Sequence, residues 1–136
     1  MINKEQFARD FIALFPQYQA DYEEHLQDYS EILGHVFFGN LINQPLSELL
    51  RKNIEEQIIQ KYIDFIERMY SYGDDDVKNI VEVTILEYLG DDNAVLKNAF
   101  NYFSDDLIAA SKRVEALLGR RDIIVSHKKG KTFTRW

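Results

Sequence analysis

The 136-residue sequence contains no cysteine. Disulfide bonds, thiolate nucleophiles and cysteine-ligated zinc sites are therefore excluded. No uninterrupted apolar run approaches the length that spans a membrane. The first residues also lack the basic and then apolar layout of a signal peptide. These absences predict a soluble protein in the cytoplasm, and 136 residues are enough for one domain with a core of its own.

Motifs of catalytic and metal sites are also missing. The chain has no glycine-rich phosphate loop, no Gly-x-Ser-x-Gly elbow and no His-Glu-x-x-His helix. Asp21 and His25 stand four residues apart, as do Glu31 and His35, but a surface or capping role explains such pairs better than a metal site. We therefore predict a protein without cofactor, metal or catalytic residues.

Three glutamates leave one chemical alternative open. Glu67, Glu82 and Glu87 lie among apolar residues of neighbouring predicted helices. Paired carboxylates with raised pKa values can carry acid–base work or hold a metal, although salt-bridged glutamates are the simpler interpretation because burying a lone carboxylate is costly. A carboxylate-based metalloenzyme is the least favoured hypothesis.

Charge is divided unevenly along the chain, whose net charge is −7. Residues 119–136 hold six basic side chains and one acidic one, a net charge of +5. Residues 1–118 hold ten basic and 22 acidic side chains, a net charge of −12. Such a body repels nucleic acid and anionic membranes and attracts basic proteins. Acidity also serves solubility alone.

Hydrophobic periodicity predicts about seven helices. The clearest stripe covers residues 54–72, where apolar side chains recur every three or four positions. Asn3 is expected to cap the first helix and Ser30 the third, while Gly73 is expected to end the 54–72 helix with a positive φ. Pro45 is expected to end the third helix before a short turn over residues 46–50.

Aspartate pairs open three later segments, each of which continues into an apolar stripe. Short connections between helices favour antiparallel neighbours, so we expect an all-α antiparallel bundle or a short HEAT-like helical stack. Aspartates in first turns cap helices and favour the positive end of the helix dipole. In a stack, loops of alternate helices emerge at one end, so a partner-binding acidic edge is predicted from Asp74, Asp75, Asp76, Asp105 and Asp106.

The last eighteen residues form a separate basic tail by pattern. Residues 123–125 and 132–134 are β-branched or aromatic and flank a lysine-rich loop with Gly130. This pattern is typical of a β-hairpin, and a disordered or partner-ordered tail is the alternative. We divide the chain into an acidic helical domain, residues 1–118, and a basic tail, residues 119–136.

Two stretches resemble a known group of proteins. Residues 65–79 (FIERMYSYGDDDVKN) continue to residues 83–89 (VTILEYL), and residues 34–41 read GHVFFGNL. Together they resemble small all-helical bacterial proteins, some of which act as immunity proteins of polymorphic-toxin or contact-dependent growth inhibition systems. The resemblance implies a cytoplasmic protein that binds and neutralises one cognate toxin domain, and it assigns no functional residues.

Charge and resemblance together predict a non-catalytic immunity protein that binds a basic toxin domain, expected to be a nuclease. The alternative is a HEAT-like adaptor or scaffold for a cellular protein. The sequence leaves the partner's identity and the oligomeric state open.

Overall fold

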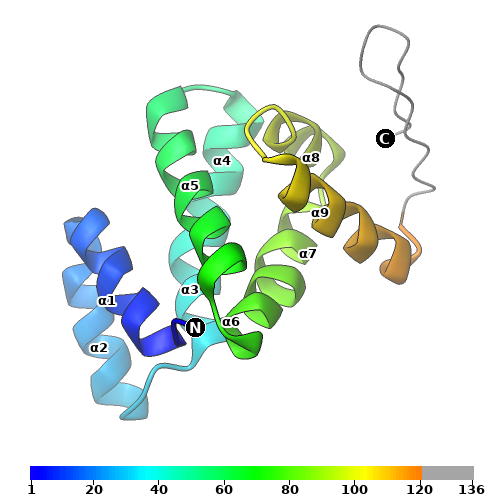
Figure 1. Ribbon diagram of the computed structural model, residues 1–136. Helices are drawn as coiled ribbons and strands as arrows, with labels where there is room; N and C mark the ends of the chain where they lie inside the picture. Colours follow the sequence, from blue (N-terminus) through cyan, green and yellow to red (C-terminus); the bar gives the residue numbers. More distant parts are fainter. Residues whose placement is uncertain (121–136) are drawn as a thin grey trace, which may run out of the picture.

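The computed structural model describes residues 1–120, and helices make up all of their regular structure apart from one isolated backbone bridge (Figure 1). The all-α prediction is confirmed. Within residues 1–120 the helical backbone runs in seven continuous segments, which are α1 (Lys4–Leu14), η1 (Pro16–Tyr18) with α2 (Gln19–Tyr29), α3 (Gly34–Phe38) with η2 (Gly39–Asn43) and α4 (Gln44–Lys52), α5 (Glu56–Tyr72), α6 (Asp75–Asn79) with η3 (Ile80–Leu86) and α7 (Glu87–Leu89), α8 (Asn93–Ala99), and α9 (Asp105–Leu118). The predicted hairpin falls on residues 121–136, outside this range.

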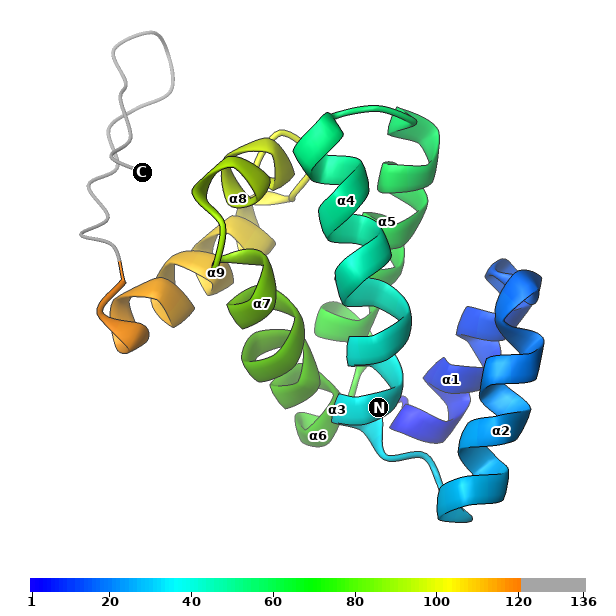
Figure 2. The ribbon, with the colours of Figure 1, turned by 180° about the vertical axis from the view of Figure 1, so that it is seen from behind.

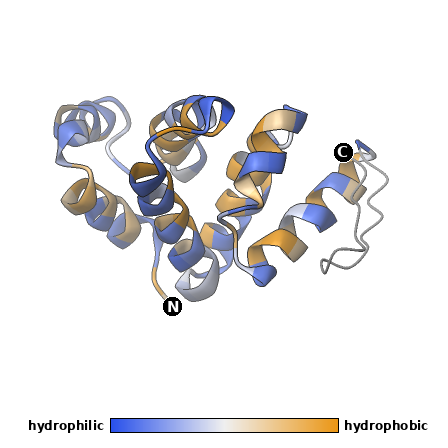
Figure 3. Cartoon of the chain, turned by 90° about the horizontal axis from the view of Figure 1, so that it is seen from above, coloured by the Kyte–Doolittle hydropathy of each residue, from blue (hydrophilic) through white to orange (hydrophobic). Residues whose placement is uncertain are grey.

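The helices follow one another across the molecule. Pair α1–α2 lies at one side and α9 ends at the other, with the α3–η2–α4 segment, α5 and the α6–η3–α7 segment between them (Figures 1 and 2). Seen from above, the same order appears as a row of helices (Figure 3). No helix of residues 1–120 is both long and apolar enough to cross a membrane.

Two cores of different composition hold the row together. In the N-terminal part, α1 packs its aromatic face against α3 and α5, and Phe11 stacks on Phe15 at 4.7 Å and meets Phe65 at 5.2 Å between ring centroids. In the C-terminal part the buried side chains are mostly aliphatic, among them Val81, Ile85, Leu86, Leu89, Val95, Leu96 and Leu107. Helical periodicity anticipated these buried faces only in part, since Ile54, Ile58 and Tyr88, which follow the same period, are 40–48% exposed.

Side-chain caps begin four of these helices. Asn3 accepts the Gln6 N–H at 2.9 Å, Asp74 that of Val77 at 3.0 Å, and Asp92 that of Ala94 at 2.9 Å. Ser104 caps α9 in the same way. The predicted capping roles of Asn3 and of the aspartate-pair openings are therefore confirmed, because a cap needs only residues close in sequence.

Three local predictions were wrong. Ser30 is the left-handed C-cap of α2 with φ 63°, and Leu33 precedes α3. Pro45 does not end the third helix, because it lies in the first turn of α4, just after the π-helical turn η2 has interrupted the ordinary hydrogen-bond ladder. Gly73 has an extended backbone with φ −73° and no positive φ.

Close packing explains the glycine at position 73. A Cβ there would lie 2.4 Å from both the Met69 carbonyl oxygen and a Val77 methyl group. Ile2 also binds the connection between α5 and α6. Its N–H donates to the Tyr72 carbonyl at 2.9 Å, and its carbonyl accepts from the Asp74 N–H at 3.0 Å. The chain's start is thereby fixed to the α5–α6 connection.

Candidate protein-binding site

An acidic stretch of sequence runs through the N-terminal half of the chain. Between residues 10 and 50 the sequence has no lysine or arginine and seven carboxylates, which are Asp10, Asp21, Glu23, Glu24, Asp28, Glu31 and Glu48. Asp21, Glu24 and Asp28 follow one another at helical spacings of three and four, so they share one face of α2. That face turns towards α3 and η2.

A cavity of about 200 Å³ opens between α2 and the α3–η2 segment. The three carboxylates form one wall, and the other groups lining it are His25, Tyr29, Val36, Phe37, Asn40 and Leu41. Tyr29 and Val36 are 46% and 38% exposed. The cavity therefore combines an anionic wall with an apolar one, both open to solvent.

His25 connects this cavity to the fold. Its ring is only 7% exposed and packs edge-on against Phe37, with 5.3 Å between ring centroids. Its Nε2 accepts the Leu33 N–H at 3.0 Å, so the proton of the neutral ring lies on Nδ1. Burial lowers the pKa of His25 below its usual value of 6.5, although nearby Asp28 acts in the opposite direction.

The wall of carboxylates has no counter-charge in the described fold. Within residues 1–120, the ion pairs join other parts of the chain, and none involves Asp21, Glu24 or Asp28. Like charges along one helix face repel one another. A cation with an apolar stem would relieve this repulsion and cover the apolar wall.

A second cavity of about 320 Å³ continues from Asn40 towards α7. Its other lining residues are Gly39, Asn43, Gln44 and Tyr88. Here η2 meets η3, since Asn43 donates through Nδ2 to the Thr84 carbonyl at 3.2 Å. A Cβ at Gly39 would lie 3.0 Å from a Thr84 methyl group, so glycine permits this approach. Figure 2 shows α2 and α7 on opposite sides of the α3–α4 segment.

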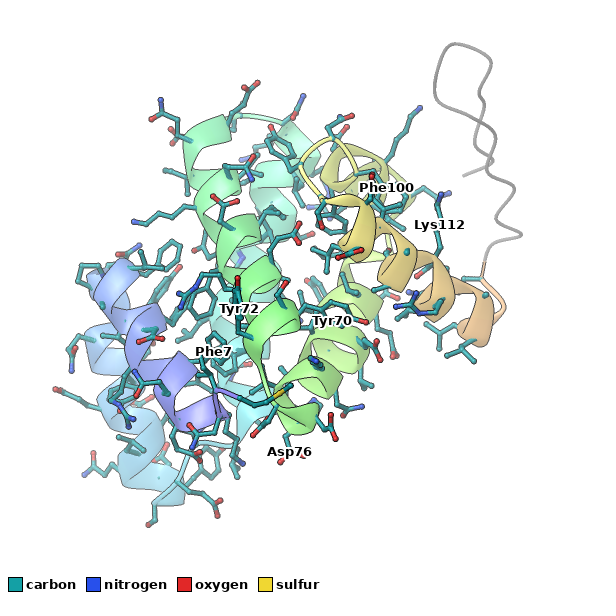
Figure 4. All side chains as sticks on the ribbon, viewed as in Figure 1. Phe7, Tyr70, Tyr72, Asp76, Phe100 and Lys112 are labelled. Atoms are coloured by element: carbon teal, nitrogen blue, oxygen red, sulfur yellow. The ribbon has the colours of Figure 1, made fainter. Side chains whose placement is uncertain are left out.

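The predicted acidic edge is divided in the structure. Asp76 lies at the start of α6, at the lower end of the molecule in Figure 4, whereas α9 begins with Asp105 higher up, beside α8. The structure therefore does not bring Asp74, Asp75 and Asp76 together with Asp105 and Asp106. Asp74 already accepts a backbone N–H as a cap. A partner-binding role for these five residues stays a prediction.

Two of the three candidate glutamates of a metalloenzyme have separate side-chain partners. Glu67 accepts from both the N–H and the hydroxyl of Ser104 at 2.7 Å. Glu82 accepts from the Tyr70 hydroxyl at 2.6 Å. At Glu87 the backbone carbonyl accepts from Arg120 at 2.8 Å. No group of three His, Asp or Glu side chains within residues 1–120 could hold a metal ion.

Of the three α2 carboxylates, the sequence analysis considered only Asp21, in its pair with His25, and it predicted none of them to bind a partner. Their signal was the absence of lysine and arginine between residues 10 and 50, which the net charge of the whole domain conceals. The cavity itself had no signal, because it depends on the angle at which α2 meets η2.

Comparisons with known proteins give one family. Neither curated proteins nor solved structures gave a match. The family described as "Domain of unknown function (DUF7674)" matches residues 8–119, which include all the elements of the site. The chain therefore belongs to this family of all-helical domains of unknown function.

Proposed function

We propose that this protein is a non-catalytic binding protein that holds a basic protein partner on the face formed by α2, α3 and η2. The observation that supports this most is the cavity whose wall consists of Asp21, Glu24 and Asp28. These carboxylates have no counter-charge in the described fold. A basic partner would supply that charge.

The negative charge of this face favours a basic protein as the ligand over nucleic acid or an anionic membrane. An acidic face raises the association rate of basic proteins and repels nucleic acid and anionic lipid. The apolar wall adds contact area that a small inorganic cation cannot use. An exposed tyrosine such as Tyr29 is a frequent anchor residue of protein interfaces.

The specific form of the proposal is an immunity protein that neutralises a cognate toxin domain, expected to be a basic nuclease. Its support is the resemblance of residues 34–41 and 65–89 to such proteins, together with the acidic face. A nuclease has a basic groove for its nucleic acid, and an acidic protein competes for that groove by charge.

Co-expression with the protein encoded immediately upstream tests this function. We expect that protein alone to arrest growth, this chain to restore growth, and the two to elute as one complex in size-exclusion chromatography. Absence of both the complex and the protection would contradict the proposal.

Charge-reversal variants locate the contact. Glu24→Lys with Asp28→Lys should slow association about tenfold or more at low salt if the α2 face binds. Asp75→Lys with Asp105→Lys is the matched control with the same change in charge at the predicted edge. A larger effect of the second pair would move the contact to the starts of α6 and α9.

A helical adaptor for a cellular protein is the second candidate. The row of helices in Figure 3 supports it, since extended helical arrays bind their partners along one face. Growth protection separates the two candidates, because an adaptor would not neutralise a toxin.

A further inference from the structure

We propose that the cavity between α2 and η2 is a pocket for one arginine side chain of the protein partner. This inference rests on the proposed function and adds the chemical group that the site selects. It requires that a single cationic side chain fits the cavity in size, in charge and in the position of its hydrogen-bond partners.

The size of the cavity restricts its occupant. Sites for drug-sized molecules measure about 300–1,000 Å³. The cavity measures about 200 Å³. It therefore holds one side chain rather than a folded segment or a cofactor.

The two walls match the two parts of an arginine. Val36 is exposed and lines the cavity together with the largely buried Phe37 and Leu41, so it offers most of the apolar surface for the three methylene groups. Asp21, Glu24 and Asp28 are spread over two turns of α2, and a planar guanidinium has five N–H donors that reach more than one carboxylate. Lysine has a compact ammonium group, which pairs with fewer of these oxygens and does not stack on Tyr29 as well.

His25 provides the second, independent observation. The ring is more than nine-tenths buried, lines the cavity, and uses Nε2 for the Leu33 N–H. Its protonated Nδ1 makes no hydrogen bond within the described residues and is not fully enclosed. Because Nδ1 is open to solvent and carries the proton, it is available to donate to a backbone carbonyl next to a partner's arginine.

The protonation of His25 at Nδ1 also argues that the cavity does not hold a metal ion. A metal binds the lone pair of an imidazole nitrogen. In His25 one lone pair already accepts the Leu33 N–H, and the other nitrogen carries the proton. The carboxylates of this face also do not converge as a metal-holding group in residues 1–120.

NMR titration of the full-length protein with N-acetyl-arginine N-methylamide tests the pocket. We expect binding on the order of 1 mM, as for a fragment of this size, with shifts at the Leu33 amide, the His25 ring and the Asn40 side chain. N-acetyl-lysine N-methylamide should bind at least about threefold more weakly, and the neutral citrulline analogue should not bind.

Two neighbouring residues of α2 give a matched pair of variants. Glu24→Gln should weaken arginine binding about fivefold, because Glu24 lines the cavity. Glu23→Gln removes the same charge from the adjacent position, which does not line the cavity, and should leave binding within about twofold. Both positions are exposed, so neither substitution should affect folding.

Each contrary outcome has a definite meaning. Equal weakening by Glu23→Gln and Glu24→Gln, or no shift at Leu33 and His25, would overturn the pocket and leave a charge-driven interface possible. Equal binding of the lysine analogue would overturn arginine selectivity. Failure of the proposed function is seen separately, as the absence of a complex and of protection in the co-expression experiment.

Discussion

The acidic side chains of the two halves of this molecule serve different purposes. In the C-terminal half, carboxylates support the fold, since Asp74 and Asp92 cap helices and Glu67 binds the start of α9. In the N-terminal half, Asp21, Glu24 and Asp28 line a solvent-open cavity and have no ion pair within residues 1–120. A carboxylate that has no ion pair within its own fold is the better candidate for binding a partner.

A buried ion pair is the clearest example of a carboxylate that supports the fold. The Glu115 side chain is fully buried and accepts from Arg120 at 2.6 Å, while Arg120 also binds Asp91 at 2.5 Å. A Cβ at Gly90 would lie 2.1 Å from the Glu115 carboxylate, so only glycine leaves room for it. This charge is part of the core, in contrast to the α2 carboxylates at the surface.

The largest expected loss of stability comes from the aromatic core of the N-terminal half. Phe11→Ala should lower the free energy of unfolding by about 3–5 kcal/mol, because the ring is fully buried among other aromatic rings and leaves a cavity. Urea unfolding followed by circular dichroism measures this. A loss below about 1 kcal/mol would contradict the packing described for α1.

Breaking the buried ion pair between Glu115 and Arg120 should cause the next largest loss of stability. Arg120→Met leaves the Glu115 carboxylate buried without its guanidinium, which should cost about 3 kcal/mol in the free energy of unfolding. Lys97→Met, at an exposed position of α8, removes an equal charge and should change stability by no more than about 0.5 kcal/mol. Equal effects of the two substitutions in urea unfolding would remove the distinction between core and surface charges.

A cap of the C-terminal half should have a moderate effect. Asp74→Ala removes the acceptor of the Val77 N–H and should destabilise the protein by about 1 kcal/mol. Asp28→Ala, near the end of α2, should have no such cost, because a negative charge there faces the negative end of the helix dipole. Thermal unfolding of the two variants compares them directly, and the reverse order would be evidence against the assignment of their roles.

Stability of the N-terminal half should depend on pH through His25. Burial lowers the pKa of His25 in the folded protein, so the unfolded chain binds the proton more readily. This contribution is therefore fully present above pH 6.5, the value of the unfolded residue, and is lost as the pH falls through the lowered pKa. Protonation also removes the acceptor of the Leu33 N–H.

Comparison with a non-titrating variant isolates this effect from the carboxylates. His25→Gln keeps an acceptor for the Leu33 N–H. Between pH 7.5 and pH 5.5 the wild-type protein should lose more of its unfolding free energy than His25→Gln. An equal loss in urea unfolding at the two pH values would contradict the shifted pKa.

The smallest effect on stability is expected at the proposed binding face. Glu24→Gln should change the free energy of unfolding by no more than about 0.5 kcal/mol, with a gain expected because it relieves repulsion along α2. Thermal unfolding measures this change. A clear loss would mean that Glu24 supports the fold, and the contrast between the two halves would then fail.

The positions of the helices and most of their caps could be predicted because both depend on residues near one another in sequence. The 3.6-residue period of residues 54–72 anticipated α5, and the aspartate at position 74 anticipated the start of α6. Pro45 and Gly73 could not be interpreted locally. The first follows a π-helical turn, and the second packs against Met69 and Val77.

By itself, the sequence determined an all-helical, acidic domain without cysteine chemistry and with an uneven distribution of charge. The tertiary structure decided which carboxylates form contacts within the fold. Glu67 binds Ser104, 37 residues away in sequence, and Asp91 binds Arg120, 29 residues away. The tertiary structure also placed the α2 carboxylates beside an apolar wall from α3 and η2. Contacts between distant positions depend on the angles and register at which helices pack, and these angles arise from the whole core rather than from any local pattern.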